Sequence, residues 1–224
     1  MPVKGILFDL DGVIVDTLHY HFLAWQEMFK RKDGEVKELT VLIHEGRSSK
    51  EILPILIKES GIQIPEEKWN DFIEEKRKYY RSIVKVIFYP DALDTVRKLR
   101  KLGIKCALVT ACAKKNMEKA LTSEQRALFN IIVTGDDIPR AKPNPDPYEI
   151  AQTQLGYKKE ECLVVENAPL GIQSAKAAGI RCAVIATTLP MEYLKGADFY
   201  LKKLPDIFKY ISLFQNHSEG LQPF

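Results

Sequence analysis

Two aspartates lie two residues apart at the end of an apolar run near the N-terminus. The run spans residues 5–8 and is followed by Asp9, Leu10, Asp11 and Gly12. A carboxylate that follows a buried strand can act as a nucleophile, and a second carboxylate beside it can act as a general acid and base. The same pattern fits a strand end with solvated acids and a glycine turn, so these residues alone leave both interpretations open.

Three later segments place further polar groups after apolar runs. Thr110 and Ala111 offer a hydroxyl and backbone N–H groups that can hold phosphate oxygens. Lys142 stands in a proline-rich loop, where a side chain loses less entropy on being fixed than on an open surface. Glu166 and Asn167 open a helical pattern, in which Asn167 would also be a good N-cap. A structural threonine and a solvated loop lysine remain alternatives for the first two segments.

Taken together, these residues predict magnesium-dependent phosphoryl transfer. Mg²⁺ prefers oxygen ligands and usually keeps water and substrate phosphate in its shell. The reaction needs negative charge neutralised around the phosphorus, and nucleophile and leaving group held in line. We predict that Asp9 is the nucleophile and that Mg²⁺, Lys142 and Thr110 neutralise the charge. Asp11 would protonate the leaving oxygen and later activate water.

The elements that must position these residues alternate between strand and helix patterns. The strand candidates are continuous apolar runs, as expected for strands buried on both faces of a parallel sheet. Helices between them have clear signals, such as Asp146-Pro147 before one and Gly156 after it. The alternation predicts an α/β fold with a doubly wound, Rossmann-like parallel sheet. The strand candidates are residues 5–8, 105–109, 131–133, 162–165 and 182–185.

Residues 16–86 interrupt this alternation and look entirely helical, with no convincing strand. We predict an α/β catalytic core of residues 1–15 and 87–224 with an inserted helical cap of residues 16–86, lying over the carboxyl ends of the strands. The cap would move as a lid, hinged where the chain crosses into and out of it. Apolar residues recur on one face of each of two cap helices, namely Leu18, Phe22, Trp25 and Phe29, then Trp69, Phe72, Ile73 and Tyr80.

Composition restricts the other classes of function. The 224 residues are 46% hydrophobic with a net charge of only +3, and the basic run 97–101 is typical of a solvated helix face, so we expect no nucleic-acid partner. Four cysteines lack C-x-x-C pairing and no histidine has zinc-ligand spacing, which indicates reduced thiols and a cytoplasmic protein. We see no signal peptide and no apolar run long enough for a membrane span. We expect a monomer or weak dimer.

The four motifs, their order and the helical insertion resemble the haloacid dehalogenase superfamily of phosphohydrolases over residues 1 to about 187. The segment 8–17 carries most of this resemblance, and the segment 19–25 resembles the β-phosphoglucomutase-like branch with a helical cap. The resemblance implies that Asp9 is phosphorylated and that Asp11 is the acid and base. It also implies that phosphate is bound by Thr110 with its neighbour Ala111 and by Lys142.

The resemblance further implies a metal site and a cap contact. Mg²⁺ would be held by the Asp9 carboxylate, the Asp11 backbone carbonyl and position 167, with Glu166 at the metal, and His21 would orient Asp11. Position 167 departs from the pattern, because it is Asn where much of the branch has Asp. A neutral amide oxygen can still bind the ion, but with one negative charge less.

A second departure concerns the cap. Glu45 and Ser49 stand where the mutase has the Lys and Arg around its second phosphate. This favours a phosphatase of a small phosphorylated metabolite, such as a sugar phosphate, over a sugar-phosphate mutase. A receiver-like signalling module is a third possibility, although it would need neither a lid nor Asp11. The cap residues predicted to contact substrate are His21, Trp25, Arg47, Ser48 and Lys76, with a cap-core role for Trp25 and a surface position for Lys76 as alternatives.

Overall fold

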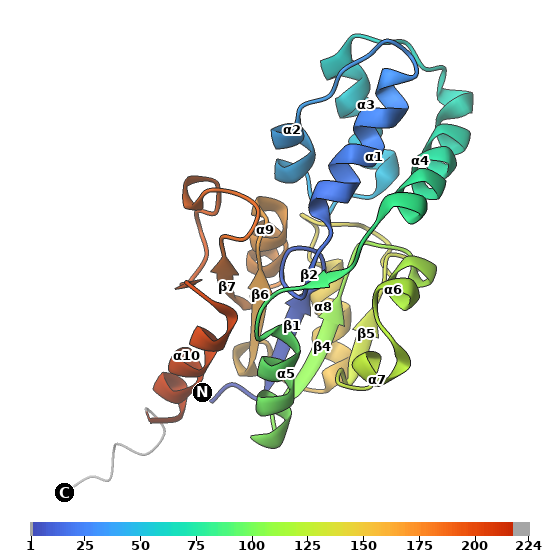
Figure 1. The fold of residues 1–224 in the computed structure, drawn as a ribbon. Helices are drawn as coiled ribbons and strands as arrows, with labels where there is room; N and C mark the ends of the chain where they lie inside the picture. Colours follow the sequence, from blue (N-terminus) through green and yellow to red (C-terminus); the bar gives the residue numbers. More distant parts are fainter. Residues whose placement is uncertain (1, 217–224) are drawn as a thin grey trace, which may run out of the picture.

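The computed structural model describes residues 2–216 and contains a six-stranded parallel sheet (Figure 1). The strand order is β5-β4-β1-β6-β7-β8, so β1 lies between β4 and β6. The predicted α/β fold is confirmed. One strand of this sheet, the three-residue edge strand β8, was not predicted from the sequence. The strands are β1 Gly5–Asp9, β4 Lys105–Val109, β5 Ile131–Val133, β6 Cys162–Glu166, β7 Arg181–Ile185 and β8 Phe199–Leu201.

Helices cover both faces of the sheet, and a separate apolar cluster fills each interface. Successive residues of β1 alternate between them, since Ile6 and Phe8 belong to one cluster and Leu7 to the other. The first cluster includes α5 and α10 and the second includes α8 and α9. The core helices are α5 Ala92–Lys101, α6 Lys114–Ala120, α7 Ser123–Arg126, α8 Asp146–Leu155, α9 Pro169–Ala177 and α10 Ile207–Asn216. The 3₁₀ helices are η1 Glu66–Lys68, η2 Lys159–Glu161, η3 Met191–Tyr193 and η4 Leu204–Asp206.

Two helix starts differ by one residue from the sequence prediction. Helix α8 begins at Asp146 with Pro145 as its cap, so Asp146 is not the N-cap. Helix α9 begins at Pro169 with Ala168 as its cap, and the predicted N-cap role of Asn167 is wrong. Proline suits the first helical position because it lacks the N–H that would have no partner there. Asn167 is therefore available for another role.

Four helices occupy the chain between two short antiparallel strands, β2 Val15–Asp16 and β3 Ile87–Phe88. These strands lie where the sequence analysis expected the hinge and no strand. The helical block (α1 to α4) stands over the carboxyl ends of the sheet strands in Figure 1. It has its own apolar cluster, including Phe22 and Phe29 of α1 and Phe72 of α4. That residues 16–86 move as a lid stays a prediction. The helices are α1 Leu18–Lys30, α2 Glu38–Ile43, α3 Ser49–Ser60 and α4 Trp69–Ile83.

Two further observations concern the predicted thiols and the character of the helices. All four cysteines are free, and Cys106, Cys162 and Cys182 are buried in the strands where the sequence placed them. Within residues 2–216, no helix combines the length and the apolar character that crossing a membrane requires.

Candidate active site

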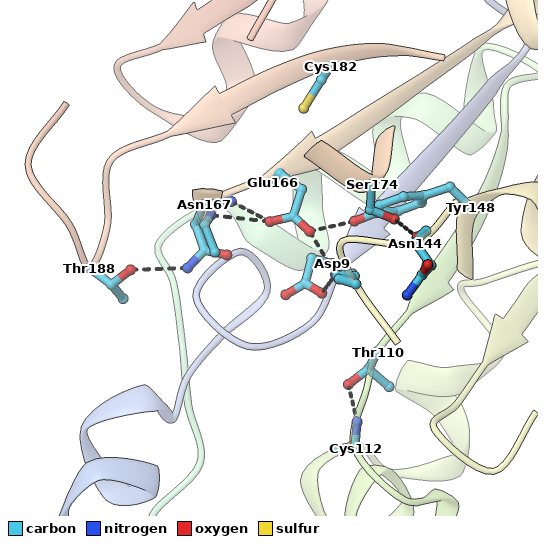
Figure 2. A network of polar contacts seen from close by, with 12 residues as sticks. Asp9, Thr110, Cys112, Asn144, Tyr148, Glu166, Asn167, Ser174, Cys182 and Thr188 are labelled. Atoms are coloured by element: carbon cyan, nitrogen blue, oxygen red, sulfur yellow. Dashed lines mark hydrogen bonds and ion pairs between the residues drawn. The ribbon is translucent and has the colours of Figure 1, made fainter. Parts of the chain in front are cut away.

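Three predicted residues meet at the carboxyl ends of neighbouring strands. Asp9 ends β1, Thr110 directly follows β4 and Glu166 ends β6. Because β4 and β6 flank β1 in parallel register, their carboxyl ends lie on either side of Asp9 (Figure 2). All three side chains are buried. The sheet topology thus brings together residues that are up to 157 positions apart, from Asp9 to Glu166.

Lys142 joins two of these carboxylates. Its Nζ lies 2.5 Å from Asp9 Oδ1 and 2.7 Å from Glu166 Oε1, and its side chain is 3% exposed. The loop that carries it is tied to α9, because Ser174 Oγ donates to the Asn144 carbonyl at 2.6 Å. This burial excludes the alternative of a solvated loop lysine.

The charged groups of this cluster shift one another's pKa values. Burial alone would lower the pKa of Lys142, but the carboxylates of Asp9 and Glu166 outweigh it and raise that pKa. Lys142 therefore stays charged. Burial raises the pKa of Asp9 well above its usual value, with Lys142 opposing and Glu166 adding to the shift. When both acids are ionised, they outnumber the one lysine, and a cation would balance the remaining negative charge.

Asp11 is held by a residue to which the sequence analysis gave no role. The hydroxyl of Thr17, between β2 and α1, donates to Asp11 Oδ1. Burial raises the pKa of Asp11, and this hydroxyl opposes the shift. The prediction that His21 orients Asp11 does not match this structure, in which His21 Nδ1 lies 3.0 Å from Lys76 Nζ. Burial, helped by the charge of Lys76, keeps the pKa of His21 well below its usual value, so the imidazole is neutral.

Both carboxylate oxygens of Glu166 accept hydrogen bonds from protein donors. Its Oε1 accepts from Tyr148 Oη at 2.5 Å as well as from Lys142, and its Oε2 accepts from the backbone N–H groups of Asn167 and Ala168 at 2.9 and 3.2 Å. A Cβ at Gly171 would lie 1.8 Å from Oε1, so only glycine leaves room for this carboxylate. The predicted metal-ligand role of Glu166 stays a prediction, because all four of these contacts are with protein donors. In this structure it positions Lys142.

Asn167 has the opposite property, because one of its polar atoms lacks a partner. Its Nδ2 donates to Thr188 Oγ1 at 3.1 Å, whereas its Oδ1 is buried without a hydrogen bond. Figure 2 shows this amide on the same side of the site as the Asp9 carboxylate. A buried acceptor without a partner costs about 1–3 kcal/mol, which a hard cation would offset.

These donors fit Mg²⁺. Among residues 2–216 there is no group of three or more His, Cys, Asp or Glu arranged to hold a metal. The predicted set does not depend on such a group, because besides Glu166 it uses the carboxylate of Asp9, the backbone carbonyl of Asp11 and the amide oxygen of Asn167. All are oxygen donors, which Mg²⁺ prefers, and few of them are needed since the ion keeps water and phosphate ligands.

A cavity of about 150 Å³ lies between the strand ends and the helical block. Of the predicted nucleophile and acid/base pair, Asp11 lines this cavity and Asp9 does not. Every residue predicted to contact substrate from the cap lines it, and so does the predicted phosphate-loop residue Ala111. These residues are His21, Trp25, Arg47, Ser48, Lys76 and Ala111.

The cap residues differ in what else they do. Lys76 is buried, not a surface lysine, with Nζ 4.9 Å from the centre of the Trp25 ring. Burial lowers its pKa to about 8, although Glu45 opposes the shift. Trp25 also stacks on Phe72 in the helical cluster, so it is part of the cap core. Ser48 is the N-cap of α3, where its N–H donates to Glu51 at 2.8 Å.

The loop between α2 and α3 lines one side of the cavity. Glu45 lines it, and burial together with the nearby Asp11 raises the pKa of Glu45 to about 7. Arg47 also lines it, and its Nε is buried without a partner. A Cβ at Gly46 would lie 2.8 Å from Lys142 Cδ, so this loop packs directly on the lysine of the core site.

Comparison with known proteins agrees with this geometry. The family model of the haloacid dehalogenase-like hydrolases matches residues 6–185. Hexitol phosphatase A of Escherichia coli (strain K12) is 30% identical over 209 residues, which cover 92% of this chain and 94% of that protein. Validoxylamine A 7'-phosphate phosphatase of Streptomyces hygroscopicus subsp. limoneus is 29% identical over 208 residues, covering 91% and 95%.

A solved structure extends the likeness to the fold. The β-phosphoglucomutase of Clostridium difficile superimposes with a TM-score of 0.82 at 24% identity, covering 96% of this chain and 98% of that one. The coverage includes the helical block as well as the sheet. All the motifs that carried the sequence resemblance lie within the range matched by the family model. The chain therefore belongs to the haloacid dehalogenase-like hydrolase family, with the fold of its β-phosphoglucomutase-like branch.

Proposed function

We propose that this protein is a magnesium-dependent phosphatase that hydrolyses a small phosphorylated metabolite through an aspartyl-phosphate on Asp9. The observation that carries the proposal is the buried Asp9–Lys142–Glu166 cluster at the strand ends, near a cavity that Asp11 lines. Two relatives named as phosphatases, of validoxylamine A 7'-phosphate and of hexitols, support the same reaction class.

The residues divide the reaction between them. A carboxylate oxygen of Asp9 attacks phosphorus while Asp11 gives a proton to the leaving oxygen, so that an alcohol departs. Asp11 then takes a proton from water, whose oxygen attacks phosphorus and restores Asp9. Lys142, with Thr110 and the backbone beside it, neutralises charge on the phosphate oxygens. Mg²⁺, held by Asp9, the Asp11 carbonyl and Asn167, would supply further neutralisation when bound.

We propose that residues 16–86 act as a lid that excludes bulk water and contacts the leaving group. The support is that the block is joined to the core by two chain crossings, at β2 and β3, and that its α2–α3 loop packs on Lys142. His21, Trp25, Arg47 and Lys76 face the cavity, where they can contact substrate. Closure would then couple recognition of the leaving group to the chemistry.

Phosphatase activity is favoured over the mutase alternative by Glu45. A mutase must bind a bisphosphate in either orientation, and so needs positive charge around its second phosphate. Here Glu45 stands where the mutase has its lysine, and it lines the cavity together with Arg47 and Lys76. The likeness to β-phosphoglucomutase at 24% identity concerns the fold and does not oppose this choice. A receiver-like module is disfavoured, because the cavity and the buried Asp11 have no use in it.

The proposal includes a cytoplasmic setting and a small-molecule partner, with no nucleic acid or membrane and a monomer or weak dimer in solution. Four free cysteines are compatible with a reducing compartment.

A panel of sugar and polyol phosphates, assayed for phosphate release with Mg²⁺ or with a chelator, tests the function. We expect release that requires Mg²⁺. Adding a sugar bisphosphate separates the alternatives, because a mutase would need it and would return an isomer in place of free phosphate. No release from any ester, generic or natural, would overturn the proposal.

A further inference from the structure

Tyr148 lies under the site and is completely buried. Its ring, on α8, belongs to the apolar cluster on one face of the sheet. Its hydroxyl reaches out of that cluster and donates to Glu166 Oε1 at 2.5 Å (Figure 2). A phenylalanine would fill nearly the same space, so packing alone does not account for the hydroxyl.

The oxygen that Tyr148 contacts is the one that Lys142 uses. Lys142 Nζ lies 2.7 Å from Glu166 Oε1 and 5.1 Å from the centre of the Tyr148 ring. Tyr148 therefore contacts both partners of the ion pair, the carboxylate through its hydroxyl and the ammonium through its ring face. Burial and the charge of Glu166 hold the pKa of Tyr148 well above its usual value, so the hydroxyl keeps its proton and remains a donor.

The rest of the Glu166 carboxylate is fixed by backbone. Oε2 accepts from the N–H groups of residues 167 and 168, and the Gly171 backbone leaves room for the head group. With Oε2 anchored, rotation of the carboxylate is limited by what holds Oε1. Only Tyr148 and Lys142 hold that atom within the described part of the chain, and Lys142 must also serve Asp9.

We propose that Tyr148 is a positioning residue, whose hydroxyl fixes the Glu166 carboxylate and thereby the place of the Lys142 ammonium beside Asp9. The inference rests on the proposed function, in which Lys142 neutralises the transferred phosphate. Without the hydroxyl, Glu166 has a free lone pair and draws Lys142 away from Asp9. Small displacements of a group that contacts the reacting atoms are costly to rate.

The test compares Tyr148→Phe with Tyr210→Phe. Tyr210 is a matched control, because its hydroxyl also donates to protein, to the Tyr200 carbonyl at 3.2 Å, but away from the site. With saturating Mg²⁺, we measure kcat/KM for p-nitrophenyl phosphate, the dissociation constant of inorganic phosphate by calorimetry, and the melting temperature. Tyr148→Phe should lower kcat/KM and weaken phosphate binding about ten-fold each, on the scale of one hydrogen bond to a charged group. Tyr210→Phe should change neither.

A double-mutant cycle with Glu166→Gln shows whether Tyr148 acts through Glu166. In the Glu166→Gln background, Tyr148→Phe should change phosphate binding less than about three-fold, because the carboxylate it positions is gone. Additive losses, or a lower melting temperature with unchanged kcat/KM and phosphate binding, would overturn the inference and leave Tyr148 a core residue. A parent protein that neither hydrolyses the ester nor binds phosphate would overturn the proposed function itself, and this inference with it.

Discussion

The core site and the helical block differ in how their charged groups are partnered. At the strand ends, Asp9, Lys142 and Glu166 are joined by contacts of 2.5 and 2.7 Å. On the helical block, Arg47 Nε is buried without a partner, and Glu45 has its pKa raised to about 7 by burial and Asp11. Groups that stabilise a reaction must be fixed beforehand, whereas groups that recognise a ligand keep bonding capacity for it to fill.

This contrast agrees with the proposal that the core site carries out the chemistry and the helical block recognises the substrate. Substitutions at the strand ends should affect every substrate alike. Substitutions in the helical block should affect the natural substrate and spare a small generic ester.

Asp9→Asn should reduce turnover to less than about 1% of the parent for every substrate, because an amide is a poor nucleophile. Lys142 keeps Glu166 as its partner in this variant, so the fold should survive. Turnover and melting temperature are measured together, with Asp94→Asn, at an exposed ion pair, as the control. Activity above that level in a folded protein would remove Asp9 from the nucleophile position.

The sequence predicted the strand-end residues because parallel topology makes them neighbours. Once apolar runs are assigned to adjacent parallel strands, Asp9, Thr110 and Glu166 must meet at one edge. The contribution of Lys142 followed from its proline-rich loop. Each of these residues lies at a strand end, directly after one, or in the loop that joins β5 to α8.

Contacts between side chains were less predictable. No role was predicted for Tyr148, and only the packed structure reveals that its hydroxyl meets Glu166. Thr17 stood inside the recognised motif, yet its bond to Asp11 depends on how β2 turns into α1. The expectation for His21 failed for the same reason, because Lys76, 55 residues away, comes within 3.0 Å of its ring.

Arg47→Ala tests the helical side of the contrast. We expect kcat/KM for the natural substrate to fall about ten- to thirty-fold, because remote contacts drive closure and a charged hydrogen bond is lost. For p-nitrophenyl phosphate the loss should stay below about two-fold. Lys50→Ala, at an exposed position of α3, which begins two residues after Arg47, is the control. Equal losses on both substrates would mean that Arg47 acts through the fold or the core site.

Asn167→Asp tests whether Asn167 Oδ1, which is buried without a hydrogen-bond partner, is a ligand of Mg²⁺. The extra negative charge should tighten Mg²⁺ binding about ten-fold, since ligand charge tunes the affinity of such sites. Calorimetric titration of Mg²⁺ measures this directly. Asn70→Asp, at an exposed position of α4, adds the same charge elsewhere. If both variants bind Mg²⁺ like the parent, Asn167 is not a ligand and its free oxygen needs another explanation.

The smallest effect concerns pH. Burial lowers the pKa of Lys76 from 10.5 to about 8, with Glu45 and Asp11 opposing the shift and Arg77 adding to it. The ammonium faces the cavity beside the neutral His21 and the ring of Tyr80. If the charged form binds substrate, KM for the natural substrate should rise about four-fold from pH 7 to pH 8.5, as the charged fraction falls.

The lowered pKa of Lys76 should also affect the stability of the fold. The direction of the pH dependence is opposite to that for a lysine whose pKa is raised by an ion pair. The folded pKa lies below the unfolded value of 10.5, so between about pH 8 and 10.5 the unfolded chain binds the additional proton. Lys76 should therefore destabilise the fold while charged, and this penalty should fade as pH rises through that window. Comparing the melting temperatures of the parent and Lys76→Met from pH 7 to 10, with the exposed Lys98→Met as control, isolates the effect. A difference between parent and Lys76→Met that does not change with pH would mean that Lys76 titrates normally, and the helical side of the cavity would then be as firmly charged as the core.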